Sequence, residues 1–131
     1  RLGAEIYKAL DGLKDFGFRD QITRSGLSIP SNIAEGIERD SNKEVARFLT
    51  IAKGSCGELR TQIYIGIEIG YIAKPTGNAW VQETREISAM LVGLIKRRQG
   101  AGDRVQEEHA SYAPDTCPLH PEASNPEREN S

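Results

Sequence analysis

The chain has few of the residue types on which disulfide scaffolds, membrane spans and histidine chemistry depend. It holds two cysteines, two histidines and one tryptophan in 131 residues. Two cysteines are too few for a disulfide framework, so we expect a reducing, cytoplasmic setting. No run of about 18 apolar residues occurs, which excludes a membrane-spanning helix. The first residues also lack the charged and then apolar pattern of a secretory leader.

Sequence motifs for phosphate binding and for acid–base catalysis are absent as well. Neither G-x-x-x-x-G-K-[ST] nor G-x-G-x-x-G is present. Both histidines, His109 and His120, lie close to the C-terminus, which leaves none in the rest of the chain for proton transfer near neutral pH. Together with Cys117 they could hold a metal only adventitiously. The sequence therefore predicts a protein that is not an enzyme and has no cofactor or metal site.

Four segments have apolar residues three and four positions apart, which is the spacing of one face of an α-helix. The third segment begins with a capping box, in which Ser41 caps the helix and Glu44 reaches back to it. Short links favour an all-α, antiparallel up-down four-helix bundle. The predicted helices cover residues 1–14, 18–39, 41–71 and 76–98, with breaks at Asp15–Gly17 and Lys74–Gly77.

Pro30 lies inside the second predicted helix. Proline in a helix interior removes one backbone hydrogen bond and crowds the carbonyl four residues earlier, at a cost of roughly 3 kcal/mol. That earlier residue is Gly26, which has no side chain to add to the crowding. We therefore expect one helix kinked at Pro30 rather than two separate helices.

The last 33 residues differ in composition from the rest. Residues 1–98 hold fifteen Lys or Arg and twelve Asp or Glu, a net charge of +3, whereas residues 99–131 hold two and seven, a net charge of −5. The second part is also rich in proline and poor in apolar residues. We expect a bundle domain over residues 1–98 and a disordered acidic tail over residues 99–131.

Polar residues on the second and third helices match one another across an antiparallel pair. Folding the chain about residues 40–42 brings together positions whose numbers sum to about 82. One interpretation is a ligand pocket. We favour a network that fixes helix register, because charges that neutralise one another leave none for a substrate. The predicted pairs are Arg24 with Glu58, Glu35 with Arg47, Ser28 with Ser55, and Gln21 with Gln62.

Four glycines inside the third predicted helix indicate a close neighbour: Gly54, Gly57, Gly66 and Gly70. Each costs about 1 kcal/mol relative to alanine, which is tolerable where another backbone approaches. A second subunit could cover the face that carries Gly57, and the alternative is an imperfect helix face in solvent. This face points away from the apolar face of the same helix. It consists of Lys43, Ala46, Thr50, Lys53, Gly57, Arg60, Thr61 and Tyr64.

Basic residues outside the polar network form a candidate nucleic-acid-binding surface. Aromatic residues for base stacking are scarce there, Tyr64 and Tyr71 being the candidates. A ring of subunits would multiply such a small patch into a belt. Charged runs are more often solvated surface, so a scaffold without nucleic-acid affinity is the alternative. The six basic residues are Lys43, Lys53, Arg60, Lys96, Arg97 and Arg98.

A long motif in the second and third helices identifies a family. The segment SIPSNIAEG at residues 28–36 is followed, from Arg39 to Gln62, by R-x-S-x-K-E-x-x-R-F-L-x-I-A-x-G-S-x-x-E-L-x-T-Q. It resembles the signature of four-helix-bundle proteins encoded in intervening sequences of bacterial 23S ribosomal RNA genes, over about residues 4–98. The resemblance implies an up-down bundle that assembles as a ring, a homopentamer.

The resemblance also bears on function. A similar architecture is found in accessory variability determinant proteins of diversity-generating retroelements, which bind nucleic acid and a reverse transcriptase and are strongly basic. We therefore expect a cytoplasmic, non-enzymatic, ring-forming bundle that binds RNA or a nucleoprotein partner. The alternative is a structural or protein-interaction scaffold.

Overall fold

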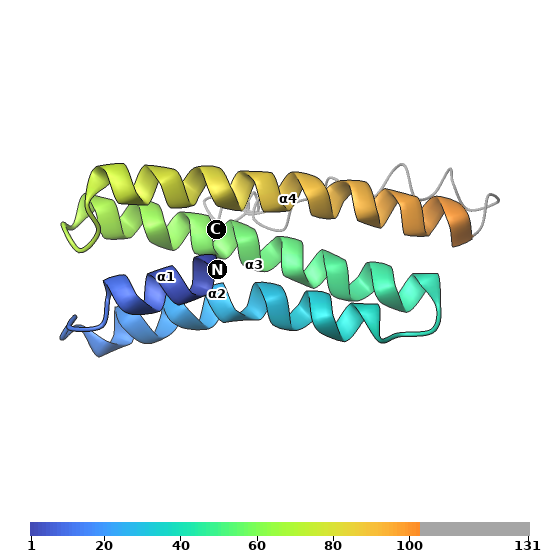
Figure 1. The fold of residues 1–131 in the computed structure, drawn as a ribbon, viewed down its shortest axis with the longest axis horizontal. Helices are drawn as coiled ribbons and strands as arrows, with labels where there is room; N and C mark the ends of the chain where they lie inside the picture. The colour runs from blue at the N-terminus through green and yellow to red at the C-terminus, as the bar shows by residue number, and fades with distance from the viewer. Residues whose placement is uncertain (103–131) are drawn as a thin grey trace, which may run out of the picture.

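The computed structural model describes residues 1–102, which form four α-helices and no strand, as the sequence predicted. Figure 1 shows the chain reversing its direction at each of the three connections. The predicted tail lies, from residue 103 onward, outside the described residues. The helices are α1 (Leu2–Ala9), α2 (Phe16–Ile37), α3 (Asn42–Glu68) and α4 (Lys74–Gly102).

Side-chain caps begin both central helices. Ser41 accepts a hydrogen bond from the backbone N–H of Glu44 at 3.1 Å, which is the cap that the sequence predicted. Asp15 was expected to form part of a turn, but it caps α2 by accepting from the N–H of Phe18 at 3.1 Å. Each cap stabilises its helix by about 1 kcal/mol.

The junction between α3 and α4 differs from the prediction. Gly70 has a φ of +88°, which suits glycine, and it ends α3. The backbone N–H groups of Tyr71 and Ile72 then donate to the carbonyl of Gly66 at 2.8 and 3.1 Å. The segment 74–77 was predicted to be a break, but it forms the first turn of α4, where the missing N–H of Pro75 costs no hydrogen bond.

Two other helix ends differ from the expected ones. The first helix was predicted to reach residue 14 but ends at Ala9, although Leu10 and Leu13 still pack on the core. The last helix runs to Gly102, beyond the boundary expected at residue 98. The second helix is continuous through Pro30, and a bend at that residue stays a prediction.

The apolar core lies around α3, the helix that packs against both α2 and α4. Leu59 and Ile63 of this helix are fully buried. Small or apolar residues recur along it at helical spacing, so one face supplies the core from end to end. None of the helices within residues 1–102 is long and apolar enough to cross a membrane.

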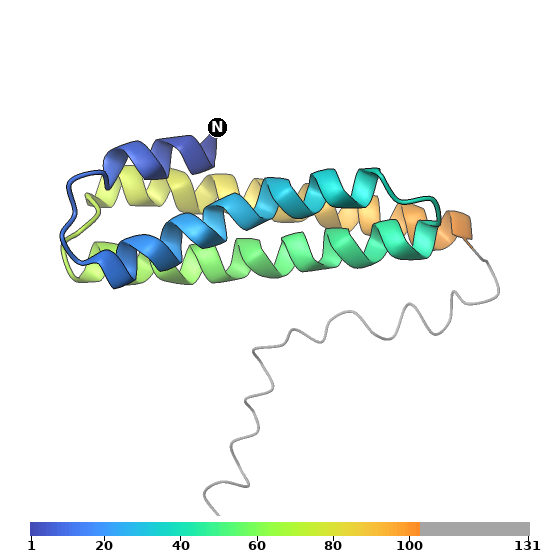
Figure 2. The ribbon, with the colours of Figure 1, turned by 90° about the horizontal axis from the view of Figure 1, so that it is seen from below.

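The short α1 lies between α2 and α4 along only part of their length (Figure 2). A Cβ added to Gly26 would lie 3.7 Å from the Cα of Gly3, so α1 and α2 approach closely. On its other side, Glu5 accepts a hydrogen bond from the indole N–H of Trp80 at 3.2 Å. Within residues 1–102, the half of the bundle next to the α2–α3 connection therefore contains three helices.

Candidate functional site

A small hydrogen-bonded group lies at the seam between α2 and α3. The Oγ atoms of Ser28 and Ser55 are 2.7 Å apart, as the predicted register requires. The Asn32 amide donates to the Oγ and to the carbonyl oxygen of Ser28 at 3.0 and 2.9 Å. Ser55 Oγ also lies 3.3 Å from the carbonyl oxygen of Ile51. No partner in this group is a base that could take a proton, so neither serine is activated as a nucleophile.

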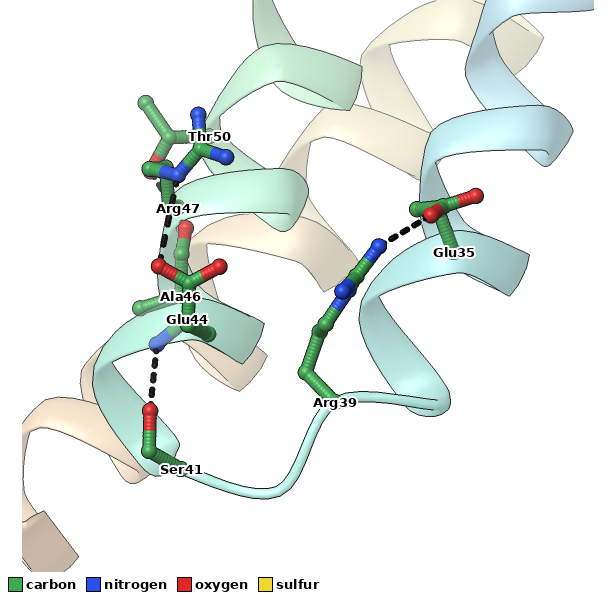
Figure 3. A network of polar contacts seen from close by, with 7 residues as sticks. All are labelled: Glu35, Arg39, Ser41, Glu44, Ala46, Arg47 and Thr50. Atoms are coloured by element: carbon green, nitrogen blue, oxygen red, sulfur yellow. Dashed lines mark hydrogen bonds and ion pairs between the residues drawn. The ribbon is translucent and has the colours of Figure 1, made fainter.

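The predicted ion pairs between the helices are wrong. Glu35 pairs with Arg39, four residues later and just beyond the end of α2, and Arg47 pairs with Glu44 at 3.6 Å within α3 (Figure 3). The guanidinium groups of Arg39 and Arg47 instead lie over the ring of Phe48, 4.9 and 4.7 Å from its centroid. The contact between these segments is thus cation–π rather than ionic.

The second predicted ion pair is also absent from residues 1–102. Arg24 pairs with Asp20 of its own helix at 2.8 Å, and Glu58 is exposed without an ion-pair partner in this part of the chain. The pairing of Gln21 with Gln62 is likewise not formed, since Gln21 is exposed and the Oε1 of Gln62 is buried without a hydrogen bond.

The predicted ion pairs do not form because of the direction in which the charged side chains point. At 100° per residue, Glu58 and Arg47 are rotated by about 60° and 80° from Ser55, away from the seam. Long charged side chains on the outer face can always reach a partner one turn along the same helix. The register of the two helices was therefore predicted well, but the faces of these residues were not.

The structure gathers four of the six predicted basic residues at one end of the bundle. Arg98, near the end of α4, donates to the side chain of Asn42, at the start of α3, at 3.3 Å. This contact places the last turns of α4 beside the first turn of α3. Four exposed residues form what we call the basic end: Lys43, Lys96, Arg97 and Arg98.

The other two basic residues lie elsewhere and are half-buried. Lys53 lies in the middle of α3. Arg60 donates from its Nε to the hydroxyl of Thr84 at 3.0 Å, and this threonine is fully buried between α3 and α4. Sequence reasoning did not identify Thr84, although it follows Trp80 by four residues on the apolar face of α4. Arg60 thus connects two helices and is not free for a ligand.

The predicted glycine face is partly covered. Ala46 is buried and Arg60 points toward α4, so these two do not belong to an open surface. The glycine positions themselves remain accessible, because a Cβ built on Gly54 or Gly57 would meet nothing within 4 Å. Both glycines therefore have room for a neighbour.

One of the two aromatic residues expected for base stacking is already engaged. Tyr71 donates to the carboxylate of Asp15 at 2.8 Å and packs edge-on against Phe18, with ring centroids 5.2 Å apart. Tyr64 is 46% exposed and its hydroxyl accepts from Arg85 at 3.0 Å. Neither ring adjoins the basic end, so base stacking at that end would need an aromatic residue other than these two.

The bond between Tyr71 and Asp15 shifts the pKa of both groups. The Tyr71 hydroxyl, followed by the backbone N–H of Phe18, lowers the pKa of Asp15, and the same bond raises the pKa of Tyr71. A lowered folded-state pKa means that the bond adds stability above the carboxyl's unfolded pKa. That stability is lost as the pH falls through the folded pKa.

Replacing Tyr71 with phenylalanine should raise the pKa of Asp15, because the strongest hydrogen bond to its carboxylate is removed. The carboxyl carbon signal of Asp15, followed by NMR from neutral to acidic pH, measures this shift directly. Tyr64→Phe is the matched control and should leave the Asp15 titration unchanged. An Asp15 titration that is equal in both variants would show that the bond does not form in solution.

Metal and thiol chemistry find little support within residues 1–102. This part of the chain has no group of three or more potential metal ligands. Its one cysteine, Cys56, is fully buried, and burial raises the pKa of its thiol to about 11. The possible ligands His109, Cys117 and His120 lie outside the described residues.

Two surface hollows among the described residues do not coincide with the polar network. One lies where α1 and α2 meet, and the other lies along α4 near Arg1. The first is lined by Tyr7, Phe16, Gly17, Arg19, Asp20 and Thr23. Neither contains a residue of the Ser28–Ser55 group.

The seam serines should be coupled energetically. Ser28→Ala and Ser55→Ala should each cost about 1 kcal/mol of unfolding free energy, because each leaves a part-buried hydroxyl without its partner. In a double-mutant cycle followed by urea unfolding, the coupling energy should be about 0.5–1.5 kcal/mol. Ser31→Ala, on the exposed side of α2, should change stability by less than about 0.5 kcal/mol. A coupling energy near zero would contradict the structural role of the pair.

Comparisons with known proteins agree with the fold. The model of a family described as 23S rRNA-intervening sequence protein matches residues 1–93. A crystal structure of a protein of unknown function from the S23 ribosomal protein family of Bacteroides thetaiotaomicron VPI-5482 is similar, with a TM-score of 0.68 and 29% identity. The match covers 72% of this chain and 92% of that one. No curated protein matches.

Proposed function

The chain belongs to the 23S rRNA-intervening sequence protein family, and from this premise we propose that it is a non-enzymatic, cytoplasmic bundle that assembles into a ring, a homopentamer. In this proposal the ring binds RNA or a nucleoprotein partner through its basic surface. A scaffold that binds only protein is the competing function.

The basic end is the observation that carries the RNA proposal. Lys43, Lys96, Arg97 and Arg98 come from two helices that are far apart in sequence and are all exposed at the same end. Residues 1–102 carry a net charge of only +3, so one copy would bind phosphates weakly. A ring repeats the cluster once per subunit, and the repeated clusters would contact several phosphates at once.

Exposed apolar side chains support assembly. Ten large apolar or aromatic residues among the described ones are 37% or more exposed. Exposed apolar residues mark an interaction site when they gather on one face, and Ile51, Ile65 and Ile69 lie within about 40° of one another around α3. The open glycines of α3 would allow a neighbouring helix to approach closely. The ten residues are Tyr7, Phe16, Leu27, Ile37, Ile51, Tyr64, Ile65, Ile69, Met90 and Leu94.

The arrangement of polar groups supports a role without catalysis. The seam serines bond to each other and to amide groups. The acids near them pair with arginines four residues away along the chain or lie in solvent. A hydrolytic pair of carboxylates needs one member with a strongly raised pKa. Burial is what such a shift requires, whereas Glu35 and Glu58, the acids beside the seam, are both exposed.

The proposal is tested by the fluorescence anisotropy of a labelled single-stranded RNA titrated with the full chain. Contacts to phosphate release counterions, so log Kd should rise linearly with log salt concentration, by roughly 0.7 for each phosphate contact. Lys96→Glu combined with Arg97→Glu should weaken binding at least about tenfold, since each change both removes and reverses a charge.

The matched control is Lys8→Glu combined with Lys14→Glu. These two exposed lysines lie near the α1–α2 connection, at the other end of the bundle, and the change in net charge is the same. If both double variants weaken binding equally, net charge rather than the basic end is responsible. If the wild-type chain does not bind RNA at low salt, the scaffold function stands instead.

A further inference from the structure

Two guanidinium groups converge on one half-buried aromatic ring near the α2–α3 connection. The Cζ atoms of Arg39 and Arg47 lie over the ring of Phe48, 4.9 and 4.7 Å from its centroid. The end of α2 comes close enough for this contact because a buried glycine faces the ring-bearing residue. A Cβ built on Gly36 would lie only 3.0 Å from the Cβ of Phe48. We call Arg39, Arg47 and Phe48 the arginine platform.

Each guanidinium of the platform is also held by a carboxylate about one turn earlier in the chain. Arg39 pairs with Glu35 and Arg47 pairs with Glu44 (Figure 3). A guanidinium is planar: its N–H groups donate at the edge, and its faces stack on aromatic rings. The carboxylate therefore takes an edge and Phe48 takes a face, which leaves the opposite face for a second planar partner. The two arginine side chains are 41% and 58% exposed, so such a partner can reach them.

We propose that the arginine platform stacks an unpaired base of an RNA strand whose phosphates bind the basic end. This inference rests on the proposed RNA-binding function and supplies the stacking contact that Tyr64 and Tyr71 do not provide at that end. Single-stranded RNA is recognised largely through splayed-out bases that stack on aromatic side chains or on arginine planes. Such stacking accepts any base, because every base has a π-face.

The platform adjoins the basic end. Lys43 and Arg47 are four residues apart and both exposed, so they project from the same side of α3. Arg98 of α4 donates a hydrogen bond to Asn42, the residue before Lys43. Single-stranded sites span about four nucleotides or more. One strand can therefore place phosphates at the basic end and a base on the platform.

Local charge favours a base over a phosphate as the group that the platform binds. The two arginines are matched by two glutamates, so these four side chains together carry no net charge. The connection adds two exposed acids, Glu38 and Asp40, which would repel a phosphate. A neutral, planar base needs no opposite charge and binds the guanidinium by its face. The phosphates of the strand then fall to the basic end.

Abasic RNA separates base stacking from phosphate binding. The full chain is titrated into a labelled single-stranded RNA and into the same strand with abasic sites in place of its bases, and fluorescence anisotropy gives both Kd values. The wild-type chain should bind the strand with bases at least about fivefold more tightly, the low end of what one stacked base contributes. Arg39→Lys and Arg47→Lys keep the charge but lose the planar face. Each should lower this ratio of Kd values, and the double variant should bring it below about twofold. Unchanged binding to the abasic strand would show that the variants are folded.

The matched control is Arg24→Lys. Like Arg39, Arg24 pairs with an acid four residues earlier, but it lies in the half of α2 away from the α2–α3 connection. This variant should keep the wild-type ratio, and an equal fall in Arg24→Lys and Arg39→Lys would overturn the proposal. A wild-type chain that binds both strands equally would also overturn it, while phosphate binding at the basic end would stand. If neither strand binds at low salt, the platform and the proposed RNA-binding function both fail.

Discussion

Replacing Trp80 with alanine should lower the free energy of unfolding by about 3–5 kcal/mol. The indole is 4% exposed within the core, and its N–H donates to Glu5 at 3.2 Å. Because α1 has only eight residues and an isolated helix of that length is unstable in water, its docking depends on this side chain. Loss of the ring leaves a cavity and also releases α1.

Urea unfolding followed by circular dichroism measures this effect, since the variant lacks the single tryptophan used for fluorescence. Glu5→Ala is the control that keeps the ring but removes the hydrogen bond, together with the exposed ion pair between Glu5 and Arg1. It should cost about 1 kcal/mol. Hydrogen exchange of the α1 amides should become fast in Trp80→Ala while that of the central α3 amides stays slower. A cost below about 1 kcal/mol for Trp80→Ala would show that α1 is held by other contacts.

Two glycine-to-alanine changes in α3 should have opposite signs. At Gly66 a Cβ would lie 2.5 Å from the Cδ1 of Ile72 and 3.0 Å from the Cζ of Phe18, so the core must shift. Overpacking of this kind typically costs 1–3 kcal/mol. At Gly54 a Cβ would meet nothing within 4 Å, so Gly54→Ala should stabilise the helix by up to about 1 kcal/mol.

The comparison is well matched because both changes add one methyl group to the same helix. The difference in unfolding free energy between the two variants, measured by urea unfolding at one protein concentration, should be about 1–4 kcal/mol in favour of Gly54→Ala. Equal stabilisation by both would mean that Gly66 does not lie against Ile72 in solution.

Helical spacing predicted most of the fold, because burial of an apolar face largely determines a helical bundle. The cap at Ser41 and the register that joins Ser28 to Ser55 both follow from local sequence. The ends of α1 and α4 were predicted less well. Pro75 and Gly77 look like helix breakers in the sequence, but at the start of a helix proline is tolerated, so the sequence of this turn is ambiguous.

The candidate site was predicted only in part, since small changes in side-chain direction decide which charges meet. Arg47 and Glu58 are on the correct helix but point away from the seam. The role of Arg60 depends on Thr84 in another helix, and no local pattern contains that pairing. Four of the six expected basic residues, Arg97 among them, are exposed in the structure. Their gathering at one end depends on how α3 and α4 pack, which the sequence alone did not predict, and their role in binding stays a prediction.

The central claim is that this bundle acts as an assembled ring that binds a partner. The mass of the full chain in solution, measured by light scattering coupled to size exclusion across micromolar concentrations, tests that claim most directly. The chain has a mass of 14.4 kDa, so five copies give about 72 kDa, and we expect a single species of that mass. A species of 14.4 kDa at every concentration would contradict the account.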